Sequence, residues 1–162
     1  MLIRLMAAAA GVLVASGAAW AQGTGDLEGT WTLVSSVVER EGKEIDQFGP
    51  GVKGMMSLDV HGRFMFTIIG AGLPKFASNN RANGTPEENK AVVSQSIAVL
   101  GTYFVEYTSN TLVFKIEAAT FPNWDSSEQR RSIVTSGTRE LKYVTAQASS
   151  GGRGIVTWKR AD

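Results

Sequence analysis

The chain of 162 residues contains no cysteine and a single histidine. Without cysteine it has no disulfide framework, no thiol nucleophile and no thiolate metal site, so its fold must rely on a hydrophobic core. The lone His61 falls in a turn between two predicted strands, where a solvated polar residue is ordinary. No acid and hydroxyl are arranged around it as a catalytic triad requires. The sequence therefore gives no support to the common nucleophilic enzymes.

An excess of charge of one sign is also missing, since 16 Lys and Arg residues face 15 Asp and Glu residues. A chain so balanced has no field that would attract nucleic acid or an anionic membrane, and we expect no nucleic-acid partner. The adjacent acids Glu87 and Glu88 are explained by the start of a predicted helix. No spacing of His, Asp and Glu fits a metal site, so we predict no metal and no cofactor.

The N-terminus has the three parts of a leader: a positive charge at Arg4, an apolar run from Leu5 to Ala15, and small residues at Ala19-Trp20-Ala21. This pattern is typical of a secretory signal peptide. We predict that residues 1–21 are cleaved, that residues 22–162 form one β-barrel domain, and that the protein is periplasmic or secreted. No later apolar run approaches the ~20 residues that span a bilayer, so no integral membrane segment is expected after cleavage.

The remaining chain alternates apolar and polar residues over short segments separated by turn signals, which indicates β-strands. The predicted strands are Thr30–Val37, Val52–Val60, Arg63–Ile69, Thr102–Tyr107, Thr111–Ala119, Ser127–Thr135, Glu140–Ala146 and Gly154–Arg160. In the first of them one face is predicted to carry Trp31, Leu33, Ser35 and Val37. About eight antiparallel strands is the count of small ligand-holding barrels. The fold class predicted is therefore all-β, an about eight-stranded antiparallel barrel.

One helix is predicted between the third and fourth strands. Its start is indicated by an N-cap, a first-turn proline and a capping box, at Thr85, Pro86 and Glu88. Its apolar face is predicted to carry Val93, Ile97 and Leu100, and Gly101 is expected to end it. The stretch 70–84 before it has no periodicity, and a loop of this length in a compact domain is functional or mobile.

Two short motifs, one at each end of the predicted barrel sequence, indicate how the barrel closes. Gly29-Thr30-Trp31 opens the first predicted strand and Trp158-Lys159-Arg160 closes the last. Closure places the first and last strands side by side because it removes the unpaired edges of the sheet. A tryptophan ring can then stack on an arginine guanidinium. We predict that Trp31 and Arg160 form a structural plug at one end of the barrel.

Several longer motifs occur together in a recognisable order. They are Phe48-Gly49-Pro50, His61-Gly62-Arg63-Phe64, Pro74-Lys75-Phe76-Ala77-Ser78-Asn79-Asn80-Arg81, Gly84-Thr85-Pro86-Glu87-Glu88-Asn89, Gly101-Thr102-Tyr103 and Phe121-Pro122-Asn123-Trp124. From about Leu27 to Arg160 the chain resembles the bacterial and fungal lipocalin-like domain family. The resemblance implies a calycin-type barrel with an internal pocket and small apolar or aromatic ligands. In typical lipocalins the helix follows the last strands, whereas here it is predicted earlier.

Candidate ligand contacts lie on the inward strand faces and around the long loop. The loop, the helix and Trp124 are expected to cover the barrel mouth, with amides orienting a mostly apolar ligand. The predicted ligand-binding residues are Phe64, Phe66, Asn79, Asn89, Tyr103, Tyr107, Phe114, Trp124 and Arg131. For each of these residues a structural role is the alternative, because aromatic rings fill protein cores and Asn side chains form hydrogen bonds with the backbone of loops.

These patterns favour an exported lipocalin-like protein that binds a small hydrophobic or aromatic ligand inside the barrel, with no catalytic residues. A first alternative is a cyclase or isomerase-type enzyme acting on an apolar metabolite in the same pocket. In that case Tyr103, Arg131 or Asn79 would stabilise charge. A second alternative is a packed barrel with no cavity that acts through its outer surface.

Overall fold

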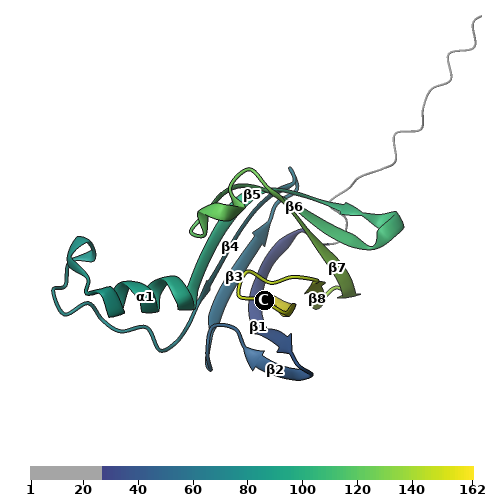
Figure 1. Cartoon of the computed structure of the whole chain (residues 1–162). Coiled ribbons are helices and arrows are strands. Elements are labelled where there is room, and N and C mark those ends of the chain that lie inside the picture. Colours follow the sequence, from purple (N-terminus) through teal and green to yellow (C-terminus); the bar gives the residue numbers. More distant parts are fainter. Residues whose placement is uncertain (1–26) are drawn as a thin grey trace, which may run out of the picture.

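The computed structural model describes residues 27–162, so the predicted signal peptide at 1–21 lies outside the described part of the chain. One antiparallel sheet of nine strands curls into a barrel (Figure 1). The strands are β1 (Gly29–Arg40), β2 (Lys43–Asp46), β3 (Lys53–Leu58), β4 (Arg63–Ile69), β5 (Ser96–Glu106), β6 (Thr111–Ala119), β7 (Glu128–Ser136), β8 (Glu140–Thr145) and β9 (Arg153–Arg160). Apart from β2, each strand pairs with the next around the barrel, and β1 pairs with β9 to close it. The predicted all-β, eight-stranded barrel is confirmed, with β2 as an additional strand.

The closing pair places Trp31 directly opposite Arg160. The guanidinium carbon of Arg160 lies 4.4 Å from the centre of the Trp31 ring. Trp31 is fully buried, and its indole nitrogen donates to the Leu27 carbonyl at 2.8 Å. The predicted plug is therefore confirmed, and we call this end of the barrel the closed end.

The long strand β1 contacts two partners along one edge. Its first residues pair with β3, and its last four pair with β2. A bulge between Leu33 and Ser35 leaves Val34 exposed, so the inward residues change from Trp31 and Leu33 to Ser36 and Val38. The single uninterrupted face predicted for this strand is wrong because a bulge adds one residue to one side of the pairing.

The helix α1 (Pro86–Gln95) lies between β4 and β5, and not between the third and fourth strands as predicted. The difference comes from β2, whose four residues are all exposed and show no apolar alternation. The start of the helix is as predicted. The Thr85 hydroxyl accepts from the Glu88 amide at 3.2 Å, and the Glu88 carboxylate accepts from the Thr85 amide at 2.8 Å.

The predicted end of the helix at Gly101 is wrong, because α1 ends at Gln95 and β5 begins at once. Ile97 and Val99 face the core while Leu100 points outward, which is the alternation of a strand. Gly101 lies at a bulge where β5 meets β6, and a Cβ atom there would be 2.1 Å from the Lys115 carbonyl oxygen. Pairing with β4 and β6 on both edges outweighs the local helical spacing of these residues.

Aromatic rings fill the middle of the barrel. The ring centres of Phe64 and Phe114 are 4.4 Å apart, and those of Phe114 and Tyr143 are 6.4 Å apart. Phe66 lies 6.3 Å from Trp158, which is fully buried. Tilted and edge-on rings at these distances stabilise a core beyond their burial alone. The interior is thus packed for much of its length. Within residues 27–162 no helix is both long and apolar enough to cross a membrane.

Candidate functional site

The end of the barrel opposite the Trp31–Arg160 plug carries its larger connections, and we call it the open end. These connections are residues 47–52, the excursion 70–95 between β4 and β5, the β6–β7 link with the 3-10 helix η4 (Pro122–Trp124), and residues 146–152. In barrels of antiparallel strands, ligands enter at an end where loops, rather than tight turns, connect the strands. A ligand site is therefore expected at the open end.

A cavity of about 50 Å³ lies at this end. Its lining residues are Ser36, Gln47, Phe48, Phe66, Ile68, Ile97, Trp124, Arg131, Tyr143, Thr145, Ala148, Ser149, Gly154 and Val156. Ser36, Arg131 and Tyr143 are buried, whereas Trp124 is half-buried and Ser149 is exposed. The cavity thus has a buried polar base and a partly exposed rim. Its volume suits a few waters or one small polar group.

Arg131 is the charged group at the base, and only 7% of the residue is exposed. Its Nη1 donates to the Gln129 side-chain oxygen at 3.3 Å and to the Arg130 carbonyl at 3.1 Å. Its guanidinium lies 6.0 Å over the Trp124 ring. Burial lowers the pKa of Arg131, while the nearby Tyr143 acts in the opposite direction. An arginine stays protonated in proteins even so, and the base of the cavity is therefore cationic.

Tyr143 supplies a second polar group at the base. Its hydroxyl oxygen accepts from the Trp158 indole nitrogen at 3.2 Å. Burial raises the pKa of Tyr143 despite the opposing effects of Arg131 and this hydrogen bond, so the hydroxyl keeps its proton. No residue between 27 and 162 accepts a hydrogen bond from that proton.

Three of the predicted ligand-binding residues line this cavity together: Phe66, Trp124 and Arg131. Phe64 and Phe114 are buried core residues outside it. Tyr103 is also buried, and its hydroxyl donates to the Asp59 carbonyl at 3.1 Å, beside the turn that joins β3 to β4. These three residues therefore serve the core of the fold and do not line the cavity: Phe64, Phe114 and Tyr103.

Tyr107, predicted as a ligand contact on an inward strand face, does not point into the barrel. The strand β5 ends at Glu106, and Tyr107 begins the 3-10 helix η3 (Tyr107–Ser109) with 57% of its surface exposed. Alternation of inward and outward side chains applies while the chain remains extended, and it stops where the backbone turns.

Asn79 and Asn89 lie on the excursion between β4 and β5, and both are exposed. The Asn89 amide donates to the Gly84 carbonyl at 3.1 Å, and Asn79 takes a left-handed turn conformation with φ of 49°. In Figure 1 the helix α1 and its loop extend outward from the barrel, and α1 buries none of its residues. The expected lid over the mouth is not observed, and these two residues serve their own loop. Of the three residues named for the enzyme alternative, Arg131 lines the cavity and Tyr103 and Asn79 do not.

Sequence reasoning missed five polar lining residues: Ser36, Gln47, Tyr143, Thr145 and Ser149. Ser36 donates to the side-chain oxygen of Gln47 at 3.1 Å, and Tyr143 lies across the base. The alternation of Leu141 and Tyr143 in β8 is a signal that would have identified the tyrosine. The bulge in β1 hid Ser36, because it reverses which residues point inward.

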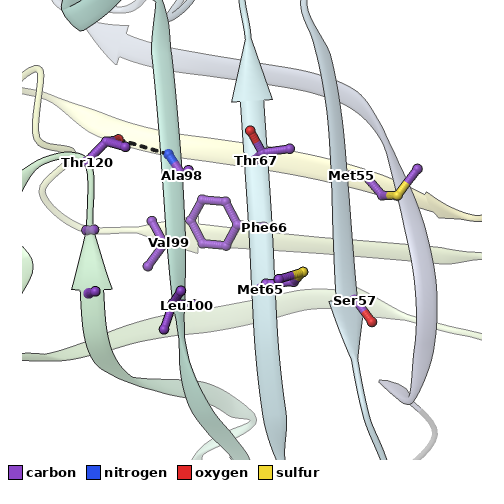
Figure 2. A pocket seen from close by; sticks show the side chains of 11 residues that line it. Met55, Ser57, Met65, Phe66, Thr67, Ala98, Val99, Leu100 and Thr120 are labelled. Atoms are coloured by element: carbon purple, nitrogen blue, oxygen red, sulfur yellow. Dashed lines mark hydrogen bonds between the residues drawn. The ribbon is translucent and has the colours of Figure 1, made fainter.

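Two further hollows lie on the outer face of the sheet. The first, of about 460 Å³, runs over β3 to β6 and is lined by Met55, Ser57, Met65, Phe66, Thr67, Ala98, Val99, Leu100, Ala118, Ala119 and Thr120 (Figure 2). The second, of about 580 Å³, adjoins it and includes Asp59, Arg63 and Glu117. Met55 and Met65 are each more than half exposed. These hollows are larger than the interior cavity but contain no buried polar group, so the interior cavity is the candidate site.

Among residues 27–162 no three His, Asp or Glu side chains come close enough together to hold an ion.

One family model matches the barrel over nearly its whole length. It is described as a lipocalin-like domain and covers residues 28–161, which span β1 to β9. A redesigned beta barrel of known structure is similar with a TM-score of 0.44 and 14% sequence identity, covering 85% of this chain and 93% of that chain. The search of curated proteins found no match.

Proposed function

Because this chain belongs to the lipocalin-like domain family, we propose that it binds a small hydrophobic or aromatic molecule at the open end of its barrel. The observation that carries the proposal is the cavity there, which has aromatic walls and a buried cationic base. Ligand sites generally combine apolar walls with a few well-placed polar groups. Burial of the ligand's apolar surface contributes about 25 cal/mol per Å², less the free energy lost on immobilisation.

The size of the cavity determines how a ligand enters. A cavity of about 50 Å³ is smaller than the roughly 300–1,000 Å³ of complete ligand sites. Trp124 is the movable part of the wall, because it is half-buried and stands in a short 3-10 helix. Its main ring contact is edge-on to Phe121, with ring centres 5.8 Å apart. The ligand's polar group occupies the base, and its apolar part displaces Trp124 outward.

A matched pair of alanine positions tests the location of binding. Ala148 lines the cavity at its rim, and Ala118 lines the hollow on the outer face. We expect Ala148→Phe to block the mouth and weaken binding of naphthalene-sized probes about tenfold, or by about 1.4 kcal/mol. Ala118→Phe should leave the affinity within about twofold. The measurement is isothermal titration with 1-naphthylacetate and 1-naphthylacetamide. The reverse pattern, or wild-type protein that binds neither probe, would contradict the proposal.

We also propose that the protein acts outside the cytoplasm, as a periplasmic or secreted binder. The support is the charge at Arg4, the apolar run and the Ala-x-Ala site before Gln22. N-terminal sequencing of protein recovered from its own host should begin at Gln22. Full-length protein found in the cytoplasm would rule this location out.

A further inference from the structure

We propose that the ligand is a carboxylic acid, whose carboxylate is held at the base of the cavity by Arg131 and the Tyr143 hydroxyl. This inference rests on the proposed function, since it concerns the same cavity and specifies the chemical class of its occupant. The ligand is then an aromatic or otherwise apolar acid, with its charged end inward and its apolar end at the Trp124 rim.

Arg131 has no counter-charge among residues 27–162. Buried charges in proteins are normally paired, because an unpaired one loses its hydration without compensation. Ion pairs among residues 27–162 join Arg130 to Glu106, Arg130 to Glu128 and Arg153 to Glu39, and none of these involves Arg131. All of them lie at the surface. The exposed Arg130 thus has two carboxylates, and the buried Arg131 beside it has none.

Arg131 also has hydrogen-bond donors that no group among residues 27–162 uses. Both hydrogen bonds from its side chain leave from Nη1. Nε and Nη2 have no acceptor among residues 27–162, although the side chain lines the cavity. A guanidinium presents two parallel N–H groups that match the two oxygens of a carboxylate. The arginine is therefore arranged to receive an anion from outside the protein.

Tyr143 adds a donor of the same kind. Its oxygen is already occupied by the Trp158 indole N–H, so its own proton is what it offers to the cavity. The Ser36 hydroxyl donates its proton to Gln47, so it offers the cavity acceptor lone pairs only. The donors at the base are therefore those of Arg131 and Tyr143, which favour an anion placed between them.

The position of Trp124 determines which part of the ligand lies next to the carboxylate. Its ring centre lies 6.0 Å from the Arg131 guanidinium carbon, so the aromatic wall begins directly beside the charge. A cavity of about 50 Å³ accommodates a carboxylate in the place of a few waters. A ring attached to that carboxylate extends from the base toward the rim and lies against Trp124 and Phe66.

The test compares an acid with its neutral isostere. Isothermal titration of the whole protein with 1-naphthylacetate and 1-naphthylacetamide should show the carboxylate bound at least about tenfold more tightly. Arg131→Met should remove this preference while amide binding persists, and Tyr143→Phe should reduce it in part. The control Arg130→Met, one residue away on the outer face, should retain it.

The outcomes separate this inference from the proposed function. If wild-type protein binds the amide as tightly as the carboxylate, the anion site is refuted while ligand binding stands. If it binds neither probe, the proposed function itself fails, and the anion site fails with it. A preference that survives in Arg131→Met assigns the anion to another group and refutes the proposal. If Arg131→Met does not fold, the wild-type comparison and Tyr143→Phe still decide the question.

Discussion

The guanidinium of Arg160, on the last strand, lies 4.4 Å over the ring of Trp31, on the first. The same guanidinium donates from Nε to the Thr138 carbonyl at 2.6 Å and from Nη1 to the Glu28 carbonyl. One side chain therefore joins β9, the β7–β8 turn and the segment before β1. This end of the barrel is sealed by segments far apart in the sequence, which leaves the opposite end as the route to the interior.

Replacing this arginine should loosen the closure. Arg160→Met removes the cation–π contact, worth about 0.5–1 kcal/mol at a part-exposed site, and two hydrogen bonds that contribute about 0.5–1.5 kcal/mol each where water can replace them. We expect the free energy of unfolding in urea to fall by about 2–3 kcal/mol. Lys159→Met, the exposed neighbour, should change it by less than about 0.5 kcal/mol. Equal changes in the free energy of unfolding for Arg160→Met and Lys159→Met would show that the contacts of Arg160 contribute nothing to stability.

The bulge in β5 leads to a second prediction. Gly101→Ala would place a Cβ atom 2.1 Å from the Lys115 carbonyl oxygen, so β5 and β6 would have to separate. We expect a loss of about 3 kcal/mol or more in the free energy of unfolding. Gly137→Ala is the matched control, because no atom lies within 4 Å of a Cβ there. Thermal unfolding of both variants by circular dichroism measures the difference, and a Gly101→Ala variant as stable as wild type would exclude the close approach.

We expect Arg131 to stabilise the protein when a ligand is bound and to contribute no stability, or to lower it, when the cavity is empty. Replacing buried charges by apolar residues is neutral or stabilising, by about 1–4 kcal/mol in known buried pairs. Arg131→Met, without ligand, should therefore unfold at the same or a higher urea concentration than wild type. A loss of more than about 1 kcal/mol would show that Arg131 also stabilises the fold of the empty protein.

Glu88 gives a pH-dependent prediction for the excursion. Its carboxylate accepts from the Ala77 amide at 2.9 Å and from the Thr85 amide at 2.8 Å, and these two hydrogen bonds lower the pKa of Glu88. Because the folded pKa lies below the unfolded value of about 4.3, the stabilisation is present above that value and is lost as the pH falls through the folded pKa.

The measurement is amide hydrogen exchange at Ala77 and Thr85. At neutral pH Glu88→Gln should exchange faster than wild type at both amides, because a neutral side chain accepts more weakly. The difference should vanish once acid has protonated the wild-type carboxylate. A difference that persists unchanged into acid would mean that charge has no part in this loop.

The barrel itself was predictable from the sequence, because its strands alternate clearly and its ends carry a matched Trp and Arg. Phe64 and Ile68 are buried on one face of β4 as their spacing predicts, while Met65 is exposed on the other. The strand β2 was not predictable, since all its residues are exposed and its pairing comes from a turn that folds it back on β1.

The site was predictable in part. Arg131, Trp124 and Phe66 were identified from inward alternation and from the motif around the tryptophan, and they line one cavity. Asn79 and Asn89 were misplaced because a loop sequence does not reveal the direction in which the chain leaves the barrel. The barrel was expected to be hollow, but aromatic rings fill its middle and leave an interior cavity at the open end. Alternation shows which side chains point inward and does not show whether they fill the interior.

Nuclear magnetic resonance of the protein titrated with 1-naphthylacetate tests the central claim most directly. Met55 and Met65 report on the outer hollow, whereas the Trp124 indole and the Tyr143 ring report on the interior cavity. We predict large shift changes at Trp124 and Tyr143, contacts from the naphthyl protons to the Trp124 ring, and no change at the two methionine methyl groups. Shifts confined to Met55 and Met65, with Trp124 and Tyr143 unmoved, would place binding on the outer face and contradict the account.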